Sequence, residues 1–395
     1  MTSTTDAPTT RATHAVYAAF LGLGLAFATW ASRIPQVRDD LDLSPASLGL
    51  LLICLSVGAL VALPTSGMVV HRLGARRTLL VTSLLFCAGL ALAGLGTRVS
   101  VAAVAPGLVL AGYGFSTWDV AANVEGAEVE HRLGWSIMPR FHALYAVGAV
   151  AGALIGVGMN ALGVSVAVHF VLAAALLAVA MVATARQFLP AGDIDEQHAE
   201  GRAHPLRAWL EPRTLLIGLF VLCMAFAEGT GGDWLGIAAI DGYGVSAALA
   251  SVVYGVFMVG MLLSRWYGHV PLDRFGRVAA LRVSAAATAL GVLVVVFAPA
   301  FPLVLAGSLL WGLGAGLGFP VGMSAAADDP RQSAGRVSVV ATVGYLAFLL
   351  GPASVGFLGE HTGVLHALTI TSALMGVAFL TAAATRPLGG GRLGR

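Results

Sequence analysis

Residues 45–77 read PASLGLLLICLSVGALVALPTSGMVVHRLGARR, a long apolar run that ends in a basic cluster. An α-helix rises 1.5 Å per residue, so about 20 apolar residues cross the hydrocarbon core of a bilayer. The run at 45–70 is long enough, and Arg72, Arg76 and Arg77 follow it where the chain returns to water. This stretch therefore predicts a transmembrane helix with a basic loop at its end.

Similar apolar runs, separated by short polar breaks, fill the rest of the 395-residue chain, which is 58% hydrophobic and 11% charged. Ordinary soluble domains have about 25% charged residues. A membrane β-barrel would show alternating segments of about 10 residues, whereas these runs are continuous and about twice as long. We therefore expect an all-α membrane protein with 12 transmembrane helices, at residues 13–32, 45–70, 77–96, 101–123, 140–161, 164–185, 214–234, 245–267, 278–297, 303–326, 337–358 and 364–385.

The charge balance and the cysteines exclude several other classes of protein. The formal net charge is +2, which gives no basis for nucleic-acid binding. The three cysteines lie inside apolar runs without paired spacing, so we interpret them as buried hydrophobic residues and expect no metal or cofactor. The sequence has no His-Glu-x-x-His motif and no Gly-x-Ser-x-Gly motif, so we expect no enzymatic activity.

The arginines predict the orientation, because short cytoplasmic loops are enriched in positive charge. All 22 basic residues are arginine, since the chain has no lysine. With the N-terminus inside, 19 of them fall in cytoplasmic segments, and only Arg33, Arg38 and Arg98 fall outside. The inverted topology would place 19 arginines on the wrong side. We therefore expect a multi-pass protein with both termini in the cytoplasm.

The longest polar stretch lies in the middle of the chain, with six apolar runs before it and six after it. The two halves share three features at an offset near 200: the loops at 71–77 and 273–277, the glycine pairs at 112–114 and 314–316, and the Tyr/Gly pairs at 145/156 and 345/356. Three such echoes suggest a duplicated unit. We expect an N-terminal six-helix bundle at 1–186, a cytoplasmic linker at 187–211 and a pseudo-symmetric C-terminal six-helix bundle at 212–395.

The loop after the second run also carries a family resemblance. The pattern Gly67-x3-His71-Arg72-x-Gly74-x-Arg76-Arg77 is similar to the signature Gly-x3-Asp-Arg-x-Gly-Arg-Arg of the major facilitator superfamily, which the chain resembles over essentially its whole length. Four stretches resemble the bacterial fucose-permease-like branch of that family and its uncharacterised inner-membrane relatives: WASRIP at 30–35, WDVAAN at 118–123, MPRFH at 138–142 and EGTGGDW at 228–234. The resemblance implies a monomeric transporter of the bacterial cytoplasmic (inner) membrane that works by alternating access.

The resemblance also implies gating roles for the two related loops. The residues concerned are His71, Arg72, Gly74 and Arg76 in the first half and Asp273, Arg274 and Gly276 in the second. In the family an Asp at the position of His71 helps to hold the cytoplasmic side closed, whereas Asp273 is kept. A neutral His cannot act as a fixed anion, and its charge changes near pH 6–7. The change is either a tolerated substitution that keeps a hydrogen bond or a weaker, pH-sensitive gate.

Ionisable side chains inside a span cost about 2.5–3.5 kcal/mol to insert, so each one is a candidate functional residue. Glu228 lies about 20 Å into the seventh run, beside a glycine cluster at 229–232 that we expect to loosen the helix. Asp119 lies in the fourth run, with Asn123 one turn further on the same face. A carboxylate is protonated more readily in a low-dielectric cavity than in water, so we assign proton coupling to Glu228 first and Asp119 second. Alternatively, Asp119 pairs with Arg140 or caps a helix end.

Further polar and aromatic residues in the spans are candidates for substrate binding by stacking and hydrogen bonding. They are Trp30, Arg33, Trp118, Asn123, His142, Tyr145, Asp233 and Trp234. Structural interpretations compete with this one. Arg33 would then extend to the outer headgroups, and His142 would be a packing histidine. The tryptophans would belong to an interfacial belt, although the position of Trp118 is too deep for one.

The sequence thus favours a proton-coupled secondary transporter, a symporter or antiporter, for a small organic solute. The alternative within transport is a proton-antiport efflux pump for a drug or secondary metabolite, and the remote alternative is a non-transport membrane receptor. The expected partners are a small-molecule substrate, the proton and the lipid bilayer. The identity of the substrate and the direction of transport stay open.

Overall fold

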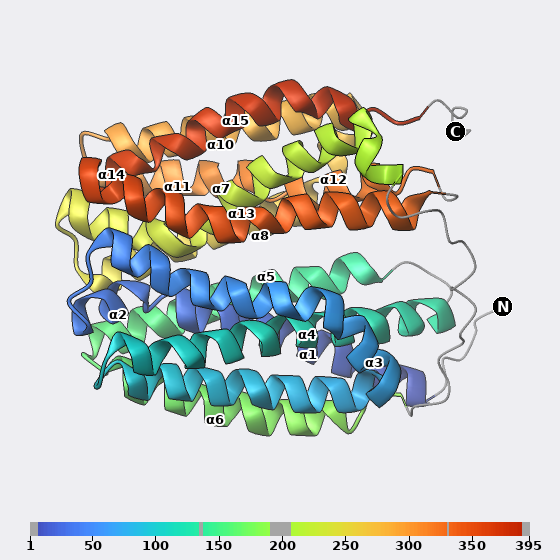
Figure 1. The fold of residues 1–395 in the computed structure, drawn as a ribbon, viewed down its shortest axis with the longest axis horizontal. Helices are drawn as coiled ribbons and strands as arrows, with labels where there is room; N and C mark the ends of the chain where they lie inside the picture. The colour runs from blue at the N-terminus through green and yellow to red at the C-terminus, as the bar shows by residue number, and fades with distance from the viewer. Residues whose placement is uncertain (1–6, 134–136, 190–206, 330–331, 389–395) are drawn as a thin grey trace. The chain divides into compact units, whose positions relative to one another are not determined.

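The computed structural model describes residues 7–133, 137–189, 207–329 and 332–388, and every regular element in these ranges is a helix (Figure 1). The first half contains α1 (Ala7–Ala31), α2 (Ile34–Asp40), α3 (Pro45–Gly96), α4 (Val101–Leu133), α5 (Met138–Ala161) and α6 (Val166–Ala185). The second half contains η1 (Arg207–Leu210), α7 (Pro212–Tyr243), α8 (Ala247–Tyr267), α9 (His269–Phe275), α10 (Arg277–Phe297), α11 (Phe301–Ala315), α12 (Gly318–Ala326), α13 (Ser333–Thr362), α14 (Val364–Ala367), α15 (Thr369–Thr381) and η2 (Ala382–Thr385).

The number of spans agrees with the sequence prediction once the longest helix is divided. Eleven helices in the described part are long and apolar enough to cross a membrane. One of them, α3, has 52 residues, and its backbone leaves the helical conformation at Gly74 (φ 76°, ψ 158°). A helix of that length would be about 78 Å long if straight, more than twice the thickness of a bilayer core. Because α3 holds two spans, the fold is the predicted all-α membrane fold with twelve spans.

The internal repeat is visible in the backbone. Gly276 adopts φ 78° and ψ 163° between α9 and α10, nearly the conformation of Gly74. Gly163 and Gly363, 200 residues apart, both have positive φ, 66° and 78°. Side chains are strained in this region of φ, so glycine is needed at each position. The predicted pseudo-symmetry of the two halves is therefore confirmed at the level of matching turns.

Two helices continue well beyond their predicted ends at residues 123 and 234. In α4, which ends at Leu133, the carboxylate of Glu128 pairs with Arg132 one turn later at 2.7 Å. The buried Glu125 accepts a hydrogen bond from the backbone N–H of Leu189 at 2.6 Å. These partners allow polar residues to stay helical, whereas the sequence prediction ended each helix where the apolar run ended.

The end of α7 is held in a similar way. Asp241 accepts two hydrogen bonds from the guanidinium of Arg38 in α2, at 2.6 and 2.8 Å. The helix ends at Tyr243, and Gly244 follows with a φ of 62°. Positive φ after the last helical residue is a common way to end a helix, and glycine adopts it without strain.

The chain forms two compact units. The first comprises residues 1–195 and 236–255, and the second comprises residues 196–235 and 256–395. Residues 236–255, which comprise the end of α7, the turn after it and the first part of α8, thus belong with the first half of the chain. There the side-chain amide of Asn160 donates to Oγ of Ser251 at 2.7 Å, and this hydroxyl donates to the backbone oxygen of Ser32 at 3.2 Å.

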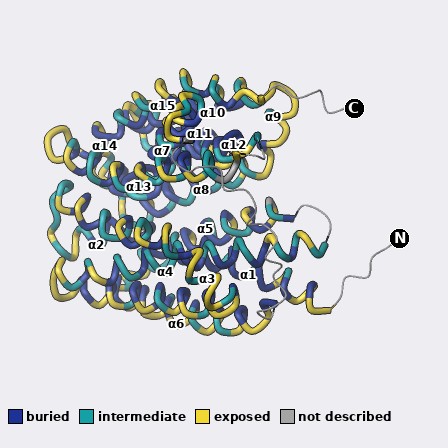
Figure 2. The backbone as a smooth tube through the Cα atoms, turned by 45° about the vertical axis from the view of Figure 1, so that its right-hand side comes forward, coloured by how far each residue is buried: buried dark blue, intermediate teal, exposed yellow. Residues whose placement is uncertain are grey.

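Close helix contacts hold each unit together. In the first unit, a Cβ atom on Gly24 of α1 would overlap the carbonyl oxygen of Tyr145 in α5, so the two backbones touch. In the second unit, Phe220, Met224 and Leu281 lie in one buried apolar cluster with Val340. The helices are apolar on their outer faces as well. In Figure 2, exposed residues recur along α6, where Leu176 and Val179 are each 73% exposed. An exposed apolar face of this kind matches lipid.

Candidate functional site

The second unit contains an ion pair inside its membrane-spanning helices. Nη2 of Arg265 in α8 donates to Oε1 of Glu228 in α7 at 2.8 Å. The two side chains are only 20% and 26% exposed. Both residues lie about 25 Å along their helices from the turn that joins α7 to α8, so they meet at one depth. Each charge offsets the cost of placing the other in an apolar region.

Arg265 also contacts a break in a neighbouring helix. The span at 301–326 is interrupted between α11 and α12, where Gly316 ends the first segment. The last carbonyls of a helix lack intrahelical donors and carry partial negative charge. Nε of Arg265 donates to the carbonyl oxygen of Gly316 at 3.4 Å. The guanidinium therefore lies between a carboxylate and the negative end of a half-helix, an arrangement typical of polar sites within membranes.

The glycines beside Glu228 serve packing, and they do not loosen the helix as expected, because α7 is continuous from Pro212 to Tyr243. A Cβ on Gly231 would lie 2.6 Å from the ring of Phe257. On the preceding turn, the indole N–H of Trp311 donates to the carbonyl oxygen of Ala227 at 3.1 Å. The small residues thus allow large aromatic rings to fix the backbone that carries Glu228.

The first unit contains a different polar pair on α4. The side-chain amide of Asn123 donates to Oδ1 of Asp119 at 3.1 Å and to its backbone oxygen at 2.9 Å. Asp119 is half-buried. Within the described ranges it takes part in no ion pair, with Arg140 or with any other cation. The carboxylate is therefore held by a neutral partner only.

Asp233 resembles Asp119 in its surroundings. It is half-buried in α7, and no described cation lies within ion-pair distance. The neighbouring Trp234 is fully buried, and its indole N–H has no acceptor among the described residues. The second unit thus places a paired carboxylate, Glu228, and an unpaired one, Asp233, on the same helix.

The other aromatic candidates lie in the interior of the first unit. Trp118 is fully buried with its ring 6.1 Å from that of Phe86, and Trp30 is 2% exposed with its ring 5.9 Å from that of Phe170. Neither indole N–H has an acceptor in the described part of the chain. A buried donor without an acceptor costs free energy, so these two indole groups destabilise the arrangement that the structure describes.

The remaining candidates for substrate binding lie in three different settings. Arg33 is 2% exposed and donates to the backbone oxygen of Val164, so it does not extend to the headgroups. His142 is exposed, with its ring edge-on to Phe20 at 4.8 Å between centroids. Tyr145 is half-buried on the same helix, α5. Within the first unit these three residues therefore have different surroundings.

The gating candidates lie at the two glycine turns. His71, Arg72 and Arg76 are exposed around the kink of α3, where Gly74 provides the turn. In the second unit, Asp273 and Arg274 are exposed on α9 before the turn at Gly276, and the guanidinium of Arg274 lies over the ring of Phe275 at 5.3 Å.

Sequence reasoning missed Arg265, which it counted among the cytoplasmic arginines. The signal was available, because Arg265 falls before the predicted end of its span at residue 267 and at the depth of Glu228. It also missed the Asn160–Ser251 contact, for which a lone amide at the end of an apolar run was the only indication.

Comparison with protein families gives a match over most of the chain. A family model described as Major Facilitator Superfamily matches residues 16–270 and 234–390. The uncharacterised transporter y4wD of Sinorhizobium fredii is 33% identical over 350 residues, which cover 87% of this chain and 90% of that protein. An uncharacterised MFS-type transporter of Yersinia pestis is 29% identical over 375 residues, 93% of each chain.

Solved structures with this fold are more distant in sequence. A variant of the nucleoside transporter NupG superposes with a TM-score of 0.78 at 16% identity, covering 95% of this chain and 99% of that one. The fucose:proton symporter FucP of Escherichia coli superposes with a TM-score of 0.65 at 16% identity, covering 94% and 98%. At this identity the likeness shows the fold alone.

Proposed function

Because the chain belongs to the Major Facilitator Superfamily, whose members are secondary transporters, we propose that it moves a small polar or amphipathic organic solute by proton-coupled alternating access. The family and the multi-pass membrane fold are given by the matches above. The solute class and the coupling to protons go beyond the family. Both are inferred from the carboxylates inside the spans: Asp119 and Asp233 have no ion-pair partner among the described residues, and Glu228 has one.

We place the protein in the bacterial cytoplasmic membrane with both termini inside. The distribution of arginines supports this orientation, because 18 of the 22 lie in segments on one side of the predicted spans even when Arg265, which is paired inside the helices, is left out. The two bacterial transporters that align with most of this chain support the assignment to a bacterial membrane. The six-helix bundles proposed at 1–186 and 212–395 then alternate the side on which the solute site opens.

The observation that carries the proton coupling is the Asp119–Asn123 pair. A half-buried carboxylate with only an amide partner can gain a proton without leaving a cation unpaired. Glu228 differs, because a proton there would break the hydrogen-bonded charge pair with Arg265. The ion pair thus favours Asp119 as the coupling residue and gives Glu228 a second role, in which it positions Arg265 toward the helix break at Gly316 and toward the solute.

Transport in everted membrane vesicles tests the proposal. A panel of nucleosides, sugars, organic acids and hydrophobic cations is screened for pH-gradient-driven movement, and the hit is repeated with Asp119→Asn. We expect the variant to lose accumulation against a gradient and to keep solute exchange at equal concentrations. Asp39→Asn is the matched control, since that carboxylate is exposed at the end of α2. Gradient-driven accumulation by Asp119→Asn at the wild-type level would contradict the assignment.

The same assay separates uptake from efflux. In an everted vesicle the cytoplasmic face of the membrane is turned toward the medium. Solute that moves from the medium into the vesicle in exchange for protons therefore indicates an efflux pump, the alternative mode. Solute that moves with protons indicates a symporter. The assignment of Asp119 predicts loss of coupling in either mode.

A further inference from the structure

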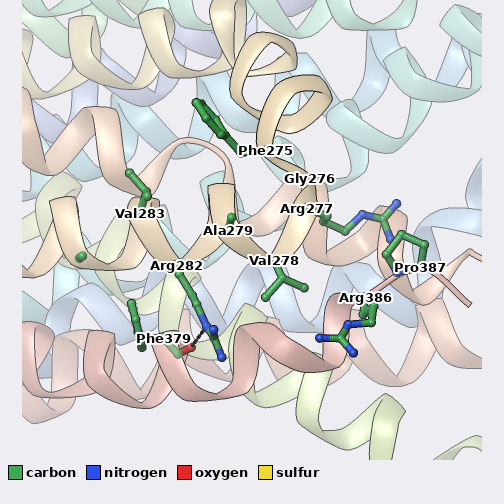
Figure 3. Close-up of a pocket in the computed structure, with 11 residues that line it drawn as sticks. Phe275, Gly276, Arg277, Val278, Ala279, Arg282, Val283, Phe379, Arg386 and Pro387 are labelled. Atoms are coloured by element: carbon green, nitrogen blue, oxygen red, sulfur yellow. Dashed lines mark hydrogen bonds between the residues drawn. The ribbon is translucent and has the colours of Figure 1, made fainter.

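A groove opens on the second unit where α9 meets α10, with a volume of about 600 Å³ (Figure 3). Eleven residues from α9, α10, α15 and the segment after η2 line it: Phe275, Gly276, Arg277, Val278, Ala279, Arg282, Val283, Ala286, Phe379, Arg386 and Pro387. Three are arginines and none is acidic. None of these three arginines takes part in the proposed proton coupling.

The arginines are held in place around the groove. Arg277 donates from Nη1 to both carboxylate oxygens of Asp328, at 2.9 and 3.0 Å. Arg282 donates from Nε to the backbone oxygen of Phe379 at 3.3 Å, and its guanidinium lies 5.2 Å from the centre of that ring. In Figure 3 this contact spans from α10 to α15.

The local charge is strongly positive. Asp328 is shared between Arg277 and Arg213, whose Nη2 donates to it at 2.9 Å. Arg213 also donates to the backbone oxygen of Arg386 at 3.0 Å and so fixes the segment that carries this exposed arginine. Asp328 therefore pairs with two guanidinium groups, and Arg282 and Arg386 have no carboxylate partner in the described chain.

The first turn of α10 adds to this positive field. The first N–H groups of an α-helix have no intrahelical acceptor, and they attract anions. Gly276 is the N-cap of α10 and has no side chain to cap them. Arg277, Val278 and Ala279, the first three residues of this helix, line the groove.

The groove continues into apolar surface. Val283 is 68% exposed and Phe379 is 40% exposed, and Leu290, two turns beyond Val283 on α10, is 54% exposed. A ligand with its charge at the arginines could therefore lay a hydrocarbon chain along α10 for about 12 Å. A small inorganic anion would use only the polar end of this surface.

We propose that the groove binds an anionic phospholipid from the membrane leaflet on the side where most of the protein's arginines lie. Its phosphate group lies at the first turn of α10 between Arg282 and Arg386, and one acyl chain lies along Val283 and Ala286. Basic pockets between transmembrane helices bind such headgroups, because charge pairing and hydrocarbon contact act together. A zwitterionic lipid offers the chain without the net charge, and inorganic phosphate offers the charge without the chain.

Native mass spectrometry of the full-length protein in detergent tests the site. The protein is titrated with phosphatidylglycerol, with phosphatidylcholine of the same acyl chains and with inorganic phosphate. We expect phosphatidylglycerol to bind most tightly, with affinity about fivefold lower in Arg386→Gln and about 30-fold lower in Arg282→Gln/Arg386→Gln. The single variant changes an exposed side chain, so it keeps the test valid if the double variant is unstable.

The matched control is Arg72→Gln/Arg76→Gln, which removes two exposed arginines at the related turn of the first unit. It should bind phosphatidylglycerol as the wild type does. Equal binding of the two lipids, unchanged affinity in Arg386→Gln, or displacement of phosphatidylglycerol by an equal concentration of phosphate would each overturn the proposal. None of these outcomes depends on transport.

Discussion

The two polar centres differ in how they compensate a carboxylate inside a membrane helix. Glu228 has a guanidinium partner at 2.8 Å, and that partner also reaches a helix break. Asp119 has one amide partner on the next turn of its own helix. A charge pair between two helices holds them in one arrangement, whereas an acid with a local amide partner can change its protonation without disturbing another helix. The two carboxylates thus suit the two roles proposed for them, Glu228 the positioning of Arg265 and Asp119 the proton coupling.

The largest effect on stability should come from breaking the charge pair on one side. Arg265→Ala leaves Glu228 without its cation, and we expect a loss of about 3 kcal/mol, since removal of one partner of a largely buried pair is strongly destabilising. Thermal unfolding of the purified protein in detergent measures the change. The double variant Arg265→Met/Glu228→Gln, which removes both charges and keeps the volume, should recover most of the loss. If the double variant is as unstable as Arg265→Ala, Arg265 and Glu228 do not stabilise the protein as a charge pair.

A smaller and pH-dependent effect should follow from Asn123→Asp. The change replaces an amide that donates to Asp119 at 3.1 Å by a second carboxyl group. Two ionised carboxylates at this distance repel each other, so the variant should lose about 2 kcal/mol at pH 8 and less at pH 5, where protonation relieves the repulsion. The difference in melting temperature between variant and wild type is measured at both pH values. A difference that does not change with pH would mean that Asp119 is not held by this side chain.

The smallest effect should come from Asn123→Ala, which removes two hydrogen bonds within one helix and leaves no cation unpaired. We expect a loss of about 1 kcal/mol. Measured beside Arg265→Ala under the same conditions, it gives the difference between the two centres directly. A loss as large as that of Arg265→Ala would remove the distinction between them.

The sequence predicted the fold well, because membrane spans and their turns depend on local properties. Apolar runs of sufficient length indicated twelve helices, and the related loops at 71–77 and 273–277 indicated the repeat that Gly74 and Gly276 share. It failed where polar residues continue a helix, as at Glu128 and Arg132, since apolarity alone cannot show a side-chain partner.

The sequence predicted the candidate site less completely. Asp119 and Asn123 were identified because a spacing of four residues puts both on one face of a helix. The partner of Glu228 was missed, because Arg265 lies 37 residues away on another helix. Pairing between helices depends on packing that no local pattern encodes. For the same reason the sequence could not show that Trp30 and Trp118 are enclosed in the interior of the first unit.

The most direct test of the central claim is an infrared titration of the carboxyl groups in the purified protein. Lowering the pH through the physiological range should produce the C=O stretching band of a protonated carboxyl group in an apolar setting. We predict that Asp119→Asn clearly weakens this band, that Asp233, which also has no described cation beside it, supplies part of what is left, and that Glu228→Gln leaves the band unchanged. A band that is unchanged in Asp119→Asn and weakened in Glu228→Gln would contradict the account.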